Sequence, residues 1–205
     1  MSGQATPKNP STTRGSYAKG IAKREEILTT ALVVIAKNGY RKASIRELAT
    51  AVGLSQTGLL HYFDSKEELY AEILHKRDKL NVPGPTLDEI ETPKQFIEAL
   101  ANLLRHNAEV PGLVQLYTQF SAEATSPEHS ARSFFQARYS SYRAVVSNFV
   151  RSQQSAGALP EHLDADKIAT LLAAASDGLQ TQWMLDNSID MAEHIEYLWD
   201  GLTAN

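Results

Sequence analysis

A short polar stretch of the chain carries side chains suited to reading a nucleic acid. Gln56 can bond to N6 and N7 of adenine together, and Thr57 can offer its methyl group to thymine or its hydroxyl to a base edge or phosphate. His61 and Tyr62 add polar or amphipathic tips a few residues further on. The other candidate contacts to DNA, by their type and their place beside this stretch, are Arg41, Lys42, Ser44, Arg46, Ser55 and Lys66.

Capping signals predict the elements that would position these side chains. Ser44 is followed three residues later by Glu47, which is the pattern of a capping box at a helix start. Gly53 falls where a helix end needs a positive φ, and Ser55 can cap a second helix over 56–62. Two short helices across such a turn predict a helix-turn-helix motif over 44–63, whose second helix enters the major groove.

The motif has an alternative reading, since any helical protein contains short capped helices with a glycine between them. The order of the signals favours DNA binding, because Ser65 with Glu68 adds a second Ser–Glu cap within 25 residues.

The run from Lys23 to Leu74 resembles the DNA-binding domain of the TetR family of bacterial transcriptional regulators. Two positions depart from the family pattern: Thr57 stands where glycine is frequent, and Leu60 stands where a tyrosine often contacts the DNA backbone. The matching segments are Ala36 to Tyr40, Ser44 with Leu48 and Ala49, Val52 to Ser55, and His61 to Phe63 with Lys66 and Leu69.

The resemblance implies a function for the whole chain. It implies a ligand-responsive regulator that binds a palindromic operator on double-stranded DNA as a homodimer and is released by a small-molecule effector of unknown identity. A repressor is the default expectation, with an activator as the alternative. A shift of the helix after the motif would change the spacing of the two DNA-binding heads.

Composition agrees with a globular regulator and indicates in which compartment we expect it. The chain has 205 residues, 42% of them hydrophobic and 21% charged, and no cysteine. It has no apolar run near 18 residues and no signal-peptide pattern at its N-terminus, so we expect a cytoplasmic protein without a membrane partner.

Charge is divided unevenly along the chain. Residues 1–80 hold 13 Lys and Arg against 8 Asp and Glu, whereas 81–205 hold 7 against 16. Since phosphate neutralisation supplies most non-specific affinity for DNA, the split assigns DNA binding to the N-terminal part.

Periodicity predicts an all-α protein of about nine helices in two domains. Residues 1–17 are expected to be a disordered arm, either a minor-groove contact or a solubilising tail. The helix-turn-helix domain is assigned to 18–80 and a ligand-binding and dimerisation domain to 81–205, after a break rich in proline and glycine. The predicted helices outside the motif are about 22–37, 66–80, 93–110, 113–124, a long one capped at Ser126–Pro127 and ending near 156, 165–185, and a last one from about 191.

The acidic domain carries aromatic and polar residues that could line a pocket. In a helical bundle each of them is more often core, but pockets are also apolar with a few polar groups. The candidate ligand-binding residues are Arg105, His106, Tyr117, Phe120, Tyr142, Asp177, Gln180 and Trp183.

The last two predicted helices are expected to form the dimer surface. One has a side of small residues that permits close approach, and the other carries apolar residues with no later chain to cover them. The candidate interface residues are Ala174, Gly178, Ile195, Leu198, Trp199 and Leu202.

Two other classes of protein were weighed against a regulator. No serine-hydrolase, Rossmann or phosphate-loop motif appears, and the six histidines lack metal-ligand spacing, so we expect no enzyme, no catalytic residue, no cofactor and no metal. A helical module that has lost DNA binding is the second alternative. Leu60 favours it, and the basic N-terminal part counts against it.

Overall fold

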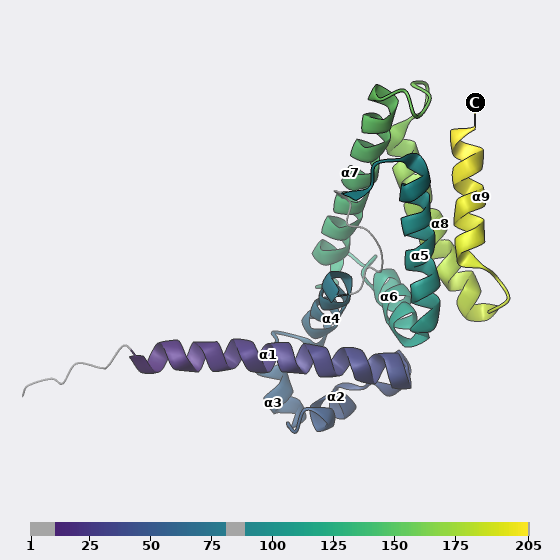
Figure 1. Ribbon diagram of the computed structural model, residues 1–205. Helices are drawn as coiled ribbons and strands as arrows, with labels where there is room; N and C mark the ends of the chain where they lie inside the picture. The colour runs from purple at the N-terminus through teal and green to yellow at the C-terminus, as the bar shows by residue number, and fades with distance from the viewer. Residues whose placement is uncertain (1–10, 81–88, 205) are drawn as a thin grey trace, which may run out of the picture.

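The computed structural model describes residues 11–80 and 89–204, without the side chains of 11–17, 41, 79 and 80. This part of the chain is all-α (Figure 1). Its helices are α1 (Ser11–Asn38), α2 (Ile45–Ala51), α3 (Gln56–Leu60), α4 (Lys66–Leu80), α5 (Pro93–Glu109), α6 (Pro111–Glu123), α7 (Arg132–Ser155), α8 (Ala165–Leu185) and α9 (Met191–Thr203), with a 3-10 turn at Tyr40–Lys42. No helix in these described ranges is both long and apolar enough to cross a bilayer.

Helix α1 lies across the base of the molecule and carries the N-terminal head (Figure 1). Ile27, Leu28, Ala31 and Ile35 recur at three- and four-residue steps and are buried. They pack in one cluster with residues of α2, α4 and α6. Burial of this stripe stabilises the helix far more than intrinsic propensity does.

The start of α1 differs from the prediction. The helix begins at Ser11 rather than near residue 22, so residues 11–17, expected in a disordered arm, are helical. Pro10 precedes this start and no proline follows before Asn38, so each added residue only extends a helix already nucleated by the packed segment. The rest of the expected arm, 1–10, lies outside the described residues, as does most of the predicted domain boundary, 81–88.

Helices α5, α7, α8 and α9 run roughly along one another above the head (Figure 1). Thr92 starts α5 with a capping box to Gln95, as predicted, and Pro93 occupies the first helical turn. Trp199 of α9 is 3% exposed and its ring lies 5.3 Å from that of Phe96 of α5, centroid to centroid. Aromatic burial therefore joins the last helix to the rest of this bundle.

The predicted cap at Ser126–Pro127 is wrong, because α7 begins only at Arg132. A guanidinium nitrogen of Arg132 donates to the carbonyl of Thr125 (2.6 Å), and the ring of His129 accepts from the N–H of Ala131 (3.3 Å). These local bonds give the backbone an alternative to a helix over 126–131.

Packing is continuous between the head and the bundle. The cluster that contains the buried face of α1 also contains Leu113, Leu116, Tyr117 and Phe120 of α6. Helix α6 therefore shares a core with the head, although it lies about 70 residues after α1 in the chain.

Candidate nucleic-acid interface and effector cavity

The helix-turn-helix prediction is confirmed at its first cap and its turn. The N–H of Glu47 donates to the Ser44 hydroxyl (3.3 Å), and the Glu47 carboxylate accepts the N–H of Ser44 (2.9 Å). Gly53 has φ +69°, and the N–H of Leu54 returns to the carbonyl of Ala49 (2.9 Å). The reciprocal cap and the left-handed glycine set where α2 starts and stops.

The second helix of the motif is shorter than predicted. Ser55 caps it by accepting the N–H of Gly58 (3.0 Å), and α3 ends at Leu60 instead of residue 62. The N–H of Tyr62 bonds to the carbonyl of Leu59 (3.1 Å), three residues back, so the last turn tightens before it stops. Leu59 is fully buried and holds α3 against the head.

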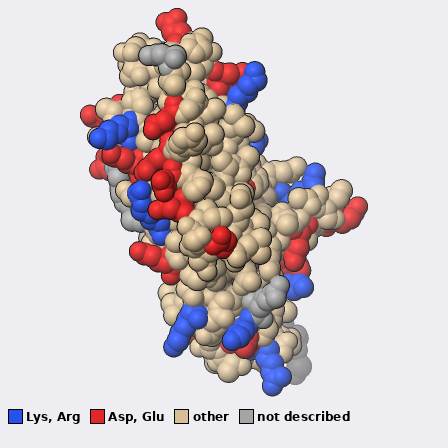
Figure 2. Space-filling view, turned by 90° about the vertical axis from the view of Figure 1, so that its right-hand side faces the viewer, with Lys and Arg blue, Asp and Glu red and all other residues tan. Residues whose placement is uncertain are grey.

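Most predicted DNA contacts lie on the open surface of the head. Gln56 and Thr57 at the start of α3 are exposed, as are Lys42, Ser44, Arg46, Ser55, His61 and Lys66. Tyr62 is half-buried, with its ring edge-on to His61 at 6.0 Å between centroids. The side chain of Arg41 lies outside the described residues. Figure 2 shows Lys and Arg side chains around this end of the molecule and a cluster of Asp and Glu further up the same face.

Leu60, the residue that departs from the family's usual tyrosine, is half-buried against the core cluster of the head. An apolar side chain suits that position, so the departure is accounted for by packing.

Arg24 of α1 was missed from the sequence, although it positions the end of α3. Its guanidinium donates to the carbonyl of Tyr62 (2.7 Å) and to Glu68 of α4 (2.7 Å), and lies 4.5 Å from the centroid of the Phe63 ring. Partial burial alone would raise the pKa of Glu68, but hydrogen bonds from Arg24 and from the N–H of Asp64 outweigh it and lower that pKa. These bonds bridge about 40 residues of chain, so no local pattern indicated them.

The bundle contains a cavity of about 580 Å³ that the head helps to close. Its wall includes residues of α4, α5, α6, α7 and α8, and its size is in the range of small-molecule sites. Five of the eight predicted ligand-binding residues line it: His106, Tyr117, Tyr142, Asp177 and Gln180.

The other three predicted ligand-binding residues do not reach this cavity. Phe120 is 1% exposed and packs edge-on against Tyr70, in the core shared with the head. Arg105 and Trp183 border a second, smaller hollow of about 340 Å³, and Arg105 pairs with Glu196 at 3.1 Å on the exposed side of α5. These three residues miss the cavity because of their position around the helix axis. A residue next to the cavity-facing stripe points into the core or into solvent.

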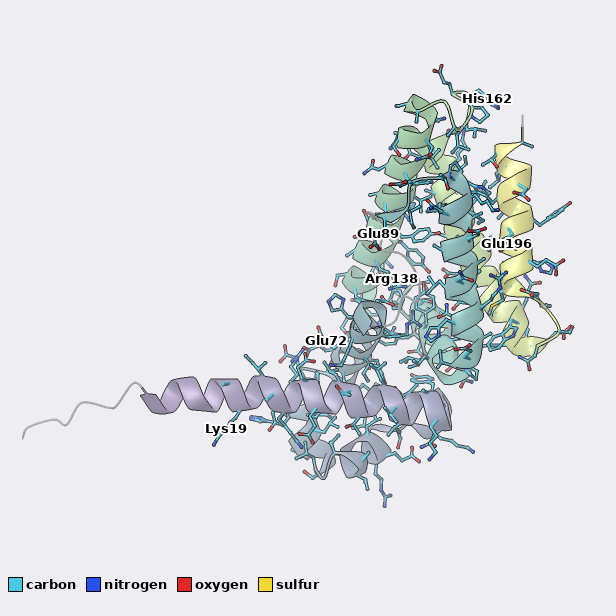
Figure 3. All side chains as sticks on the ribbon, viewed as in Figure 1. Lys19, Glu72, Glu89, Arg138, His162 and Glu196 are labelled. Carbon is cyan, nitrogen blue, oxygen red and sulfur yellow. The ribbon has the colours of Figure 1, made fainter. Side chains whose placement is uncertain are left out.

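Sequence reasoning missed the lining residues that come from α4 and from one turn of α7. They are His75, Arg77, Asp78 and Arg138. One signal was present, since Arg77 continues the apolar row of Leu69, Ile73 and Leu74 on α4, where a charged side chain is unexpected. Arg138 lies between α7 and α5, above α4 (Figure 3).

A chain of hydrogen bonds crosses the cavity wall from α6 to α8. The Tyr117 hydroxyl donates to that of Tyr139 (3.2 Å), and Tyr139 in turn donates to the Asp177 carboxylate. Burial raises the pKa of Asp177, although the hydroxyls of Tyr139 and Tyr117 partly oppose the shift. Burial, with the bond to Asp177, raises the pKa of Tyr139 to about 12. The network is thus a desolvated polar cluster in a mostly apolar cavity.

The predicted dimer surface needs a correction. Ile195 and Trp199 are 0% and 3% exposed, because α9 turns them onto α5 and into the core of the bundle. Leu198 and Leu202 are half-buried, whereas Ala174 is exposed and nothing lies within 4 Å of a Cβ built on Gly178. Two of the six predicted interface residues are therefore core, and the other four keep surface that a partner could cover.

Comparison with known proteins agrees with both halves of this architecture. Residues 27–73 match the family model described as bacterial regulatory proteins, tetR family. Residues 95–203, just over half of the chain, match the model described as BetI-type transcriptional repressor, C-terminal.

Individual relatives cover most of the chain. The HTH-type transcriptional regulator PksA of Bacillus subtilis is 24% identical over 167 residues, which span 80% of each chain. A transcriptional regulator of Saccharomonospora viridis solved in complex with choline is 26% identical, with a TM-score of 0.65 over 87% of this chain and 93% of that one. The regulator FadR of B. subtilis, solved with stearoyl-CoA, shares the fold with a TM-score of 0.68 at 17% identity, over 88% of this chain and 97% of that one.

Proposed function

The chain belongs to the TetR family of bacterial transcriptional regulators, and we propose that it is a repressor that leaves its operator when a small molecule fills the bundle cavity. It carries a DNA-binding helix-turn-helix motif, and its family is one of regulators rather than enzymes. The match of the bundle to a repressor-type C-terminal model supports the sign of regulation.

One observation carries the proposal: a single helix connects the DNA-reading motif to the cavity. Helix α4 starts at Lys66, six residues after the end of α3, and its last turns supply His75, Arg77 and Asp78 to the cavity wall. A ligand that bonds to this end of α4 in one arrangement of the heads shifts the equilibrium toward that arrangement. Coupling of about 1–3 kcal/mol would weaken operator binding about 5- to 150-fold.

A relative supports the effector half of the proposal. The S. viridis regulator, 26% identical to this chain, was solved with choline. A small-molecule effector for this chain follows by analogy, and its chemistry is argued separately from the cavity below.

We further propose that two copies join through α8 and read a palindromic operator. Leu171, Ala174, Gly178 and Leu185 recur on one stripe of α8, and Leu171 and Leu185 are 47% and 86% exposed. On α9, Tyr197 is 82% exposed. An isologous pairing of such surfaces would bury these apolar side chains and place two heads on one side of the dimer. The heads would then meet half-sites a whole number of helical turns apart.

The decisive experiment is fluorescence anisotropy of the purified protein on labelled DNA from upstream of its own gene, with scrambled DNA as control, at two salt concentrations. We expect binding at least about 10³-fold tighter than to scrambled DNA, with a steep salt dependence on both. Equal, weak binding to that DNA and to a genomic library would contradict the proposed function.

A further inference from the structure

Two guanidinium groups of the bundle cavity lie beside one aromatic ring, that of Tyr117. The guanidinium carbon of Arg77 lies 5.4 Å from the centroid of Tyr117, and that of Arg138 lies 5.1 Å from it. The remaining wall is largely apolar and includes Leu100, Leu103, Leu104, Leu113, Phe134 and Val145. A ligand that fits this wall has an apolar body and a polar group at the end near Tyr117.

Among the described residues, the two guanidiniums share one carboxylate, that of Asp78, as their ion-pair partner. Asp78 accepts from Nη2 of Arg77 (3.2 Å) and also pairs with Arg138, so two cations share this carboxylate. The nearby Asp177 accepts from Tyr139 and also attracts Arg138. Burial lowers the pKa of Arg77, and burial together with the charge of Arg77 lowers the pKa of Arg138 to about 10. An anion placed here would relieve both effects.

Several buried donors at the cavity have no partner among the described residues. They are Nη1 of Arg77 and the hydroxyls of Tyr142 and Ser176. A buried donor without an acceptor costs about 1–3 kcal/mol, so native structures rarely keep one. Three unsatisfied groups, all on lining residues of one cavity, indicate that an acceptor-rich group binds there.

We infer that the effector is an amphipathic anion, with a carboxylate or phosphate head held by Arg77 and Arg138 and an apolar body on the leucine-rich wall. Guanidinium groups suit this head because their fixed fork matches the paired oxygens of either anion. The inference rests on the proposed function, since it names the class of effector for the same cavity.

A cationic head group fits the same place poorly. The aromatic ring at its centre, Tyr117, already has two guanidiniums within 5.5 Å of its centroid. A quaternary ammonium would add a third positive charge beside them, and it has no lone pair to accept a hydrogen bond from the unpartnered hydroxyls.

The inferred site also suggests how ligand binding in the cavity would change DNA binding by the head. Asp78 belongs to α4 and Arg138 to α7, so their ion pair ties the helix below the DNA-binding head to the bundle. A ligand head bound to Arg138 competes with Asp78 for the same donors. Loss of this tie would free the end of α4 to move.

The test is isothermal titration of the full-length protein with four ligands that share a ten-carbon chain: decanoate, decyl phosphate, decanol and decyltrimethylammonium. We expect the better of the two anions to bind at least tenfold tighter than decanol and decyltrimethylammonium, and the order of the two anions to identify the head. Equal binding of decanol, tighter binding of the ammonium, or no binding of either anion would each overturn the inference.

Variants distinguish binding by the two cavity arginines from a general attraction of the anions to the protein surface. Arg77→Gln and Arg138→Gln should each lower the affinity for the better anion at least tenfold. Arg143→Gln, on an exposed position of the same α7, should leave it unchanged. An equal loss with Arg143→Gln would show attraction by the surface instead of the cavity and would overturn the inference.

Three further controls test the apolar wall, the folding of each variant and the proposed function. Leu103→Trp narrows the apolar wall without changing charge, so it should weaken the binding of all ten-carbon ligands that bind. Circular dichroism melts of every variant exclude unfolding as the cause. Operator anisotropy without ligand tests the regulator proposal alone, so a protein that binds DNA but not the anions refutes only the effector class.

Discussion

A Cβ atom at position 112 would lie 2.1 Å from the carbonyl oxygen of Ile35, so Gly112 of α6 and Ile35 of α1 are in direct backbone contact. No other residue type fits without moving one helix. The contact joins the head to the bundle, so we expect Gly112→Ala to lower the free energy of unfolding by about 1–3 kcal/mol. Gly20→Ala on α1 is the matched control, because nothing lies within 4 Å there. Chemical denaturation monitored by circular dichroism measures both, and equal stability of the two variants would contradict the contact.

Gln56→Ala should weaken operator binding without destabilising the protein. The side chain is exposed at the start of α3, so its loss removes a base contact worth about 1–3 kcal/mol and little packing. Anisotropy on the operator and on single-base variants measures this loss. Gln136→Ala, exposed on α7, is the control for a change of surface polarity alone. A fall in melting temperature with unchanged affinity would show that α3 turns Gln56 toward the core of the head instead of toward DNA.

Lys66→Ala should weaken binding to every DNA sequence alike. Lys66 is exposed, with an ion pair to Glu67 at 3.5 Å that contributes little at the surface. Loss of one phosphate contact reduces the slope of log affinity against log salt by about one unit. Lys94→Ala on α5, away from the head, should leave the slope unchanged. A loss at one base pair only would be the result that excludes a phosphate role.

Gly178→Arg should produce monomers that still fold. The position is open in the single chain, and arginine favours a helix more than glycine does, so only a partner surface would be obstructed. Gly20→Arg on α1, which is equally open, is the control. Sedimentation velocity distinguishes the two, and a persistent dimer of Gly178→Arg would place the interface elsewhere. Trp199→Asp is unsuitable for this purpose, because Trp199 is core and its loss would unfold the bundle.

Asp177→Asn should remove one component of the pH dependence of stability. Burial raises the pKa of Asp177 in the folded state above its ordinary value of 3.8, so folding favours the neutral form. The folded protein therefore loses stability as pH rises from about 3.8 through the raised pKa, because the buried carboxyl group of Asp177 becomes charged. An asparagine keeps an oxygen to accept from Tyr139 but cannot ionise. Melting temperatures measured from pH 4 to pH 7 should fall less in the variant than in the parent, and identical slopes would contradict the shift.

The sequence by itself determined the DNA-binding motif, the α-helical class and most helix limits. These features depend on bonds between residues three or four apart, such as the Ser44–Glu47 and Thr92–Gln95 capping boxes, or on one backbone angle, as at Gly53. A local pattern carries the whole of such information, since both partners are visible in one short stretch. The polar side chains of α3 that can contact bases are likewise visible in one short stretch of sequence.

Tertiary structure alone decided which apolar and charged residues face each other. Trp199 is covered by Phe96, more than 100 residues away, so a residue that suggested a dimer surface is core. Arg24 reaches Tyr62, and Arg138 pairs with Asp78, because helices distant in the chain cross at those points. Periodicity gives the face of a helix but not its neighbour, and the neighbour decides whether a side chain is core, cavity wall or interface.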